Sequence, residues 1–311
     1  MSHPDDEDTF TPWHAGEVHM HRSAGVADRM GVVGPRVIRS HLIDQHRLFF
    51  TELPFIVLGA VDANGDVWAT LRAGLPGFLY SPDPSLLRIA IGRDRIDPAD
   101  SGMNDGDAIA LLGIQLETRR RNRLNGTIRR KQGDGVEVLV QESFGNCPRF
   151  ITPRDLEFTR DPVIAGSSTG EELPHFDDAS AELVLNADTL FVASYVEGSP
   201  GRRVDVSHRG GRPGFARFDG SALMIPDYAG NLFFNTLGNF FVNPRAGLVF
   251  VDWRNGDSLQ MTGEAEVLFA RDEGAGRAWR FIPKRIVRRK KALPLRMRLL
   301  APVAVRELAD T

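Results

Sequence analysis

The polar residues best suited to bind an anion lie together in the second half of the sequence. Ser207, His208 and Arg209 place a hydroxyl, an imidazole and a guanidinium at the end of an expected strand. Gly210-Gly211 follows, and paired glycines let the backbone approach a ligand closely. This combination of donors favours a phosphate group.

Four more polar residues stand beside the start of an expected helix at residues 235–241: Asn231, Asn235, Thr236 and Asn239. The unpaired N–H groups of a helix start attract an anion, which makes these side chains candidate ligands of the same group. Asparagine is also a common helix cap and turn former, and on local chemistry this is its more frequent use.

Arginines alternate in the segment of residues 117–123, where Arg119, Arg121 and Arg123 would share one face of a strand. One interpretation is an anion site for a cofactor or substrate. The other is a solvated edge strand that charge protects from aggregation. The residues alone favour neither.

Cys147 is the single cysteine of the chain and follows Asn146 in a Gly-Asn-Cys-Pro turn. One cysteine excludes an intrachain disulfide and any metal site that needs several thiolates, and we expect no metal. Cys147 could lie beside a cofactor or react as a thiolate. Because no nearby histidine or second cysteine activates it, a small buried residue in a tight turn is the preferred interpretation.

Near the N-terminus, His14, Glu17 and His21 have the spacing of one helical face. A metal site is one interpretation of this spacing, and a solvated helix face is the preferred one.

The composition is that of a soluble globular protein. The 311 residues are 42% hydrophobic and 25% charged, and 38 Lys and Arg against 41 Asp and Glu give a net charge of -3. An overall negative charge argues against a nucleic-acid partner. The acidic N-terminus lacks a secretory pattern, and the longest apolar stretch, residues 53–61, is too short to span a membrane. We therefore expect a cytoplasmic protein.

A basic segment, residues 283–298, contains eight Lys and Arg and no acid. It could dock an acidic partner, membrane lipid or nucleic acid. Its alternating Ile, Val, Leu and Met instead favour a terminal strand or arm packed on a barrel.

The chain resembles itself at a fixed offset. Residues 72–78, Arg-Ala-Gly-Leu-Pro-Gly-Phe, match residues 209–215, Arg-Gly-Gly-Arg-Pro-Gly-Phe, at an offset of 209 − 72 = 137. Gly126 and Gly263 have the same offset, 263 − 126 = 137. Such a long repeat predicts two similar domains rather than a solenoid.

The predicted fold is mainly β (α+β), with two tandem barrels and an N-terminal helical segment. An Asn64-Gly65 turn predicts the first hairpin, and a helical stretch before it should break near Gly31, Gly34 and Pro35. The predicted parts are an N-terminal helical arm (1–50), a first unit (51–160), a linker with a short helix (161–187) and a second unit with a basic C-terminal arm (188–311).

The second unit resembles the pyridoxamine 5'-phosphate oxidase family, whose members are FMN-binding split β-barrels. The shared order is a strand ending in Arg, then Pro-Gly-Phe, a polar helix start, Asn-Pro-x-x-x-Leu-x-Phe and a strand ending in Gly. The matching segments are residues 207–209, 235–236, 243–250 and 259–263. The first unit matches weakly, which is consistent with a tandem duplication among family members whose reaction is unassigned.

The resemblance implies roles for individual residues. Residues 207–209 would lie on the strand that contacts the flavin and its phosphate. Asn235 and Thr236 stand where the oxidases carry an Arg-Lys pair, so Arg209, helix-start amides or the partner unit must neutralise the phosphate. Gln260 would point toward the cofactor.

Family members pair two barrels and hold FMN at their interface, so two units in one chain imply an intrachain pseudo-dimer. The residues that the first unit would lend across this interface are Arg119, Arg121, Arg123, Asn146 and Cys147. The implied function is an FMN-dependent oxidoreductase acting on an unidentified small substrate, with an electron-donating reductase as a partner. The alternative is a non-enzymatic flavin- or haem-binding carrier or sensor. Further association into a homodimer stays open.

Overall fold

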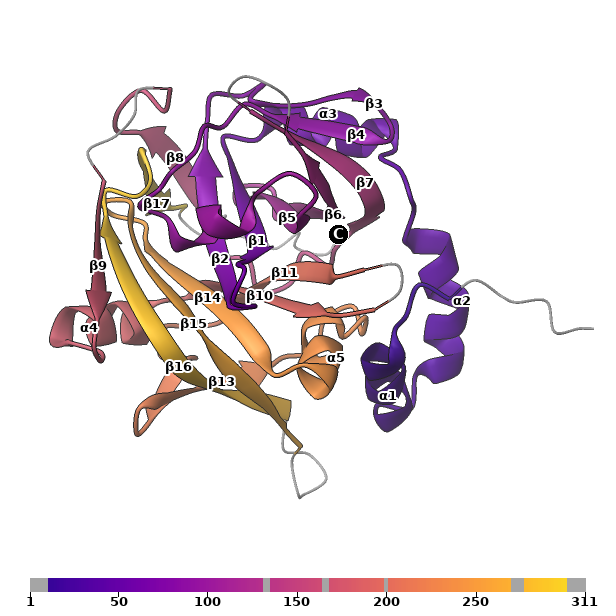
Figure 1. Cartoon of the computed structure of the whole chain (residues 1–311). Helices are drawn as coiled ribbons and strands as arrows, with labels where there is room; N and C mark the ends of the chain where they lie inside the picture. The colour runs from indigo at the N-terminus through magenta and orange to yellow at the C-terminus, as the bar shows by residue number, and fades with distance from the viewer. Residues whose placement is uncertain (1–10, 131–134, 164–167, 199–200, 270–276, 301–311) are drawn as a thin grey trace, which may run out of the picture.

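The computed structural model describes residues 11–130, 135–163, 168–198, 201–269 and 277–300. It is mainly β, and its two large sheets are built from antiparallel pairs of strands (Figure 1). The expected fold class is confirmed at this level. Within these ranges, no helix combines the length and the apolar character that crossing a membrane requires.

The first sheet has the strand order β2-β1-β5-β6-β7-β4-β3. Its strands are β1 (Phe55–Val61), β2 (Val67–Ala73), β3 (Leu79–Asp83), β4 (Leu86–Ile89), β5 (Ala108–Gln115), β6 (Arg120–Arg129) and β7 (Val136–Gly145). The predicted Asn64-Gly65 turn joins β1 to β2, and Gly65 has the positive φ, 76°, that glycine adopts readily.

The second sheet has the order β11-β10-β14-β15-β16-β13-β12, with β9 paired to β16 in addition. Its strands are β9 (Thr169–Leu173), β10 (Thr189–Val196), β11 (Arg203–Gly210), β12 (Arg217–Asp219), β13 (Ala222–Asp227), β14 (Arg245–Asp252), β15 (Asp257–Leu268) and β16 (Arg277–Lys290). If β1 is matched with β10, β2 with β11 and so on, the two sheets have the same strand order.

Both sheets also contain an irregularity at matching positions. The register of β6 against β7 shifts between Asn125 and Gly126, and that of β15 against β16 shifts between Thr262 and Gly263. A Cβ on either glycine would lie 2.1 Å from a carbonyl oxygen of the neighbouring strand. Glycine is therefore required at both bulges.

The two sheets pack against each other reciprocally. β2 contacts β14 and β15, and its counterpart β11 contacts β5 and β6. The core between them combines Val57 and Ala69 of the first sheet with Phe191, Val206 and Val249 of the second. Burial of this shared apolar surface holds the halves together.

Three helices precede the first sheet: α1 (Ala15–Ser23), α2 (Ala27–Val37) and α3 (Asp44–Glu52). The predicted break near Gly31, Gly34 and Pro35 is wrong, because these residues lie inside α2 and the chain breaks at residues 24–26 and 38–43. Gly34 packs under Trp13, where a Cβ would be 2.6 Å from the indole ring. This tertiary contact outweighs the weak helix propensity of glycine.

The face of α1 that carries Glu17 and His21 is buried, which corrects the expectation of a solvated face. It packs on α5 (Asn235–Val242), and a Cβ on Gly16 would be only 2.0 Å from the Gly238 carbonyl oxygen. Figure 1 shows α1 and α2 on one flank beside α5, and α4 (Asp178–Asn186) on the opposite flank.

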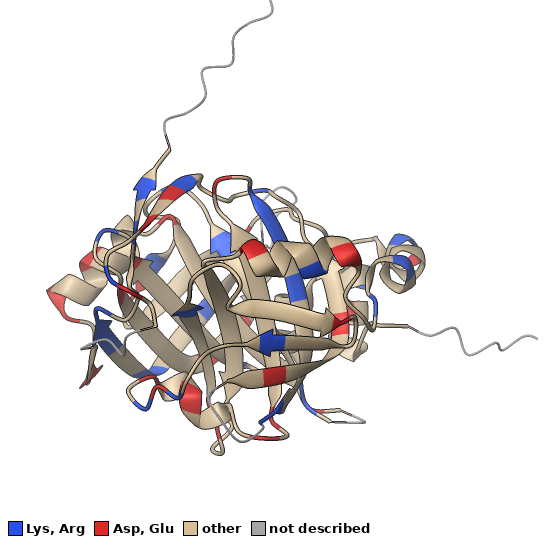
Figure 2. Cartoon of the chain, turned by 90° about the horizontal axis from the view of Figure 1, so that it is seen from above, with Lys and Arg blue, Asp and Glu red and all other residues tan. Residues whose placement is uncertain are grey.

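The basic segment contributes residues 283–290 of β16 and residues 295–298 of β17 (Leu295–Leu299), which pairs with β8 (Arg154–Phe158). Arg285 binds Glu172 of β9, and Arg296 binds Glu157 of β8. Figure 2 shows both signs of charge interspersed over the molecule. The segment therefore lies in strands, but β16 is an inner strand between β15 and β13 and not the expected terminal strand or arm. β9 lies in the predicted linker, whose residues 164–167 are outside the described ranges.

Candidate anion-binding site

A pocket of about 80 Å³ lies between β6 of the first sheet and β11 and α5 of the second. A single water needs roughly 10–15 Å³ of such space, so the pocket can hold a larger polar group. Its charged lining residues are Asp227 and five arginines: Arg121, Arg123, Arg149, Arg209 and Arg277. We call it the arginine pocket. Its positive charge, in a chain of negative net charge, favours an anion.

Arg123 of β6 reaches across to the second sheet and is almost fully buried. Its Nη1 donates to Asp205 at 2.5 Å and to the Asn235 Oδ1 at 3.2 Å, and its Nη2 donates to the Ser207 hydroxyl. The ion pair with Asp205 stabilises the buried charge. Arg123, a residue of the first sheet, therefore lines the pocket together with residues of the second sheet.

Arg121 has no carboxylate partner among the contacts of the described residues. Its Nη1 donates to His208 Nδ1 at 3.2 Å. Burial, together with the like charges of Arg123 and Arg209, lowers the pKa of Arg121 to about 9. The cation is thus held at an energetic cost that a bound anion would offset.

The contact with Arg121 also defines the state of His208. An arginine N–H only donates, so Nδ1 accepts and the ring proton lies on Nε2. Burial, reinforced by Arg121 and Arg209, holds the pKa of His208 well below its usual value, so the ring is neutral. His208 offers the pocket an N–H donor.

Arg209 and Arg277 form the other wall. The Arg277 Nε donates to Asp227 at 3.1 Å, and its guanidinium lies 4.7 Å from the centre of the Phe234 ring. Arg209 is 3.9 Å from the same carboxylate. One carboxylate thus orients two guanidinium groups and leaves an excess of positive charge.

Several buried nitrogen atoms of the lining have no hydrogen-bond partner within the described part of the chain. They are Arg121 Nε, Arg123 Nε, Asn146 Nδ2, His208 Nε2 and Arg209 Nε. A buried donor without an acceptor costs about 1–3 kcal/mol, so such groups are rarely left together. Their concentration here fits a ligand rich in acceptor oxygens.

The first turn of α5 completes the pocket. Its N-cap residue, Phe234, makes no capping hydrogen bond through its side chain and has a φ of 57°. Phe150 and Leu232, also in the lining, have φ values of 62° and 67°. Such left-handed residues cost on the order of 1–3 kcal/mol each and cluster at functional sites.

A wider groove of about 620 Å³ adjoins the pocket and shares Phe150 and Tyr228 with it. The rings of these two residues stack with centroids 5.0 Å apart, and both are nearly half exposed. Pro213 and Phe215 continue the apolar lining. The groove can accept a planar apolar group next to a bound anion.

α1 supports the first turn of α5 from behind. Glu17 accepts a hydrogen bond from the Asn235 Nδ2 at 2.5 Å and caps the backbone N–H of His14. Burial raises the pKa of Glu17 to about 8, so this carboxyl is protonated at neutral pH. Asn235 is thereby held between Glu17 and Arg123.

Nine of the residues singled out from the sequence line the arginine pocket: Arg121, Arg123, Asn146, Ser207, His208, Arg209, Asn231, Asn235 and Thr236. They come together because β6 faces β11 across the interface. Ser207 and Thr236 share a hydrogen bond of 2.7 Å, and Asn231 donates to Asn146 at 2.7 Å.

Four other candidates lie elsewhere. Arg119 is exposed in the turn before β6, with a φ of 58°, so the alternation does not reach it. Asn239 is bound to His14 and Ser194 behind the pocket. Gln260 of β15 points into the first half, where its Nε2 donates to the Ala69 carbonyl oxygen at 3.0 Å, and half-buried Cys147 follows Asn146 outside the lining.

Sequence reasoning missed Phe150, Tyr228, Asp227 and Arg277. Asp227 and Arg277 are direct partners across the β13–β16 pairing, which local patterns do not reveal. The left-handed backbone of Phe150 has no signal in its residue type.

The fold and site define an antiparallel β protein with a cationic pocket between two sheets. Neither the models of known families nor the curated proteins gave a match. Among solved structures, an FAD-binding protein from Mesorhizobium loti has 13% identity and a TM-score of 0.27, covering 39% of this chain and 97% of that one. A putative pyridoxamine 5'-phosphate oxidase from Corynebacterium glutamicum has 15% identity and a TM-score of 0.27, covering 42% and 99%. The heme storage protein HutZ from Vibrio cholerae has 14% identity and a TM-score of 0.26, covering 36% and 93%.

Proposed function

We propose that this chain binds FMN with its phosphate in the arginine pocket and is an FMN-dependent oxidoreductase acting on a small substrate. The observation that carries the proposal is the group of five buried nitrogens that have no hydrogen-bond partner among the described residues and lie among an excess of guanidinium groups. A phosphate dianion supplies both the acceptor oxygens and the negative charge that this lining requires.

Each part of the site has a role in this proposal. Arg121, Arg209 and the Nε2–H of His208 would bind phosphate oxygens, and the backbone N–H groups of the first turn of α5, whose N-cap Phe234 provides no side-chain acceptor, would add further donors. Phe150 and Tyr228 would contact the planar ring in the adjoining groove. Bound FMN would supply the redox chemistry, while the protein holds it and limits its contact with water.

We also propose that the two halves are copies of one split β-barrel that form an intrachain pseudo-dimer. The shared strand order, the equivalent bulges at Gly126 and Gly263, and the reciprocal packing of β2 and β11 support this. A phosphate site built from Arg123 of one half and Ser207 of the other is what such a pairing would produce. An electron-donating reductase remains the proposed redox partner.

A non-enzymatic flavin- or haem-binding carrier is the second candidate. The observation in its favour is that His208, held neutral by its surroundings, is a hydrogen-bond donor rather than an acid or base. Photoreduction of bound flavin without turnover of any donor would favour this candidate.

The test compares FMN with riboflavin, which lacks the phosphate. We expect the protein to quench FMN fluorescence at lower concentration than that of riboflavin. Arg209→Ala should weaken FMN binding by about 1.5–3 kcal/mol, or roughly 10–150-fold, and leave riboflavin unchanged. Arg29→Ala, at an exposed position on α2, is the matched control. Equal binding of both compounds by the wild type would reject the phosphate site.

A further inference from the structure

The first half contains a counterpart of the arginine pocket. At the offset of the repeat, Arg72 corresponds to Arg209 (209 − 72 = 137) and Gln260 to Arg123 (260 − 123 = 137). As Arg123 reaches from the first sheet into the second half, Gln260 reaches from the second sheet into the first half. The two sites thus exchange one side chain each across the interface.

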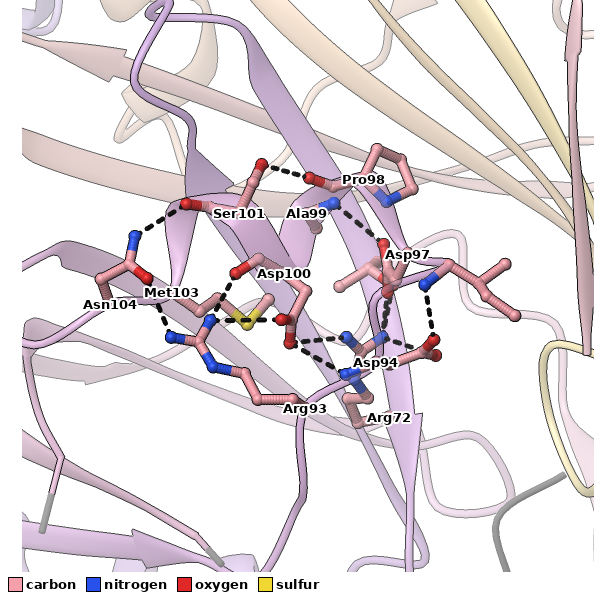
Figure 3. A network of polar contacts seen from close by, with 12 residues as sticks. Arg72, Arg93, Asp94, Asp97, Pro98, Ala99, Asp100, Ser101, Met103 and Asn104 are labelled. Atoms are coloured by element: carbon pink, nitrogen blue, oxygen red, sulfur yellow. Dashed lines mark hydrogen bonds and ion pairs between the residues drawn. The ribbon is translucent and has the colours of Figure 1, made fainter. Parts of the chain in front are cut away.

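A carboxylate of the chain itself fills this counterpart. Asp97, the N-cap of the short 3-10 helix η1 (Pro98–Gly102), is buried with its side chain fully enclosed. One oxygen accepts from the Thr70 hydroxyl at 2.5 Å and from Arg72, and the other accepts from the Ala99 N–H at 3.0 Å. Figure 3 shows Arg72 pointing at this carboxylate.

Two further groups complete the enclosure. The Gln260 Nε2 donates to Asp97 at 2.9 Å, and the Arg289 Nη1 lies 3.1 Å from it. Burial alone would raise the pKa of Asp97, but Arg72 and Arg289 lower it to about 2. The carboxylate is therefore a permanent anion, held by hydroxyl, amide and guanidinium donors such as a phosphate site would use.

The corresponding position in the second half has no such anion. Asp97 corresponds to Phe234 (234 − 97 = 137), which caps α5 without a side-chain hydrogen bond. Thr70 corresponds to Ser207 (207 − 70 = 137), so both sites retain a hydroxyl beside the matching arginine. The carboxylates of the second site, Asp205 and Asp227, stand at other positions, so the place that Asp97 fills in the first half has no chain carboxylate in the second.

We infer that Asp97 is a built-in ligand that closes a second anion site, so that the chain binds one phosphate-bearing molecule and not two. The inference rests on the proposed function, because only that proposal assigns a phosphate to the arginine pocket. Removing the Asp97 side chain should open a pocket in the first half for a free phosphate or carboxylate anion.

Calorimetric titration with inorganic phosphate tests this. We expect one site in the wild type, two in Asp97→Ala, and one in the double variant that also carries Arg209→Ala. Asp28→Ala, at an exposed position on α2, is the control and should keep one site. An unchanged number of sites in Asp97→Ala would overturn the inference.

The outcomes separate the two proposals. If the arginine pocket binds no phosphate, the wild type shows no site while Asp97→Ala still gains one. The variant removes the most deeply buried partner of Arg72 and Arg289, which keep only their contacts with Asp94 and Asp100, and could fold poorly. Recovery of its folding by phosphate or formate, but not by chloride at equal ionic strength, would support the inference. Failure of every anion to restore it would overturn it.

Discussion

Replacing Arg121 with methionine should stabilise the ligand-free protein while it weakens phosphate binding. Burial, and then the like charges of Arg123 and Arg209, lower the pKa of Arg121 to about 9, well below that of a free guanidinium. Each unit corresponds to about 1.4 kcal/mol, so the full cost of holding the cation would approach 5 kcal/mol. The side chain is partly exposed, and solvent screening reduces this to an expected gain of about 1–3 kcal/mol in the variant.

Urea unfolding with and without inorganic phosphate measures both effects. Without phosphate, Arg121→Met should have the larger free energy of unfolding. With phosphate, the wild type should gain more stability than the variant, because a ligand stabilises the state that binds it. Arg29→Met on the exposed face of α2 controls for loss of charge. A less stable variant with an undiminished response to phosphate would refute the argument.

Two further predictions concern the support of the site and the sheet. Because burial raises the pKa of Glu17 from 4.5 to about 8, the folded protein retains a proton that the unfolded chain loses, and stability should fall as the pH rises between these values. Glu17→Gln should remove this slope, which approaches about 1.4 kcal/mol per pH unit, as measured by unfolding across that range. The comparison uses the slope and not the absolute stability, because both oxygens of Glu17 accept hydrogen bonds whereas a glutamine amide accepts only through its oxygen. An unchanged slope would contradict the assignment. Gly263→Ala should lower the free energy of unfolding by about 1–3 kcal/mol, because the new Cβ would meet the Ile282 carbonyl oxygen. The control is Gly31→Ala in α2, where the new Cβ would enter open space and should not destabilise the protein. Equal thermal midpoints for these two variants would argue against a tight bulge.

Much of the architecture follows from local patterns. The Asn64-Gly65 turn, the strand at Ala108–Gln115 and the helix beginning at Asn235 all lie where turn chemistry and periodicity place them. The sequence offset of 137 residues relates Gly126 to Gly263, and both lie at bulges in equivalent strand pairs. These features depend on residues close in sequence or on comparison of the chain with itself.

The departures have long-range causes. Gly34 is accommodated in α2 because Trp13 packs on it, and the α1 face is buried because α5 covers it. The family resemblance implied that Gln260 points toward a cofactor, yet the packing of the two sheets directs its Nε2 to Asp97. Only the packing of the two halves decides such positions.

The visible absorption spectrum of the purified protein, followed by denaturation and identification of the released compound, tests the central claim most directly. We predict a yellow protein that releases FMN at one molecule per chain, since Asp97 fills the second site. A colourless protein that takes up no added FMN would contradict the assignment of the arginine pocket to a flavin phosphate.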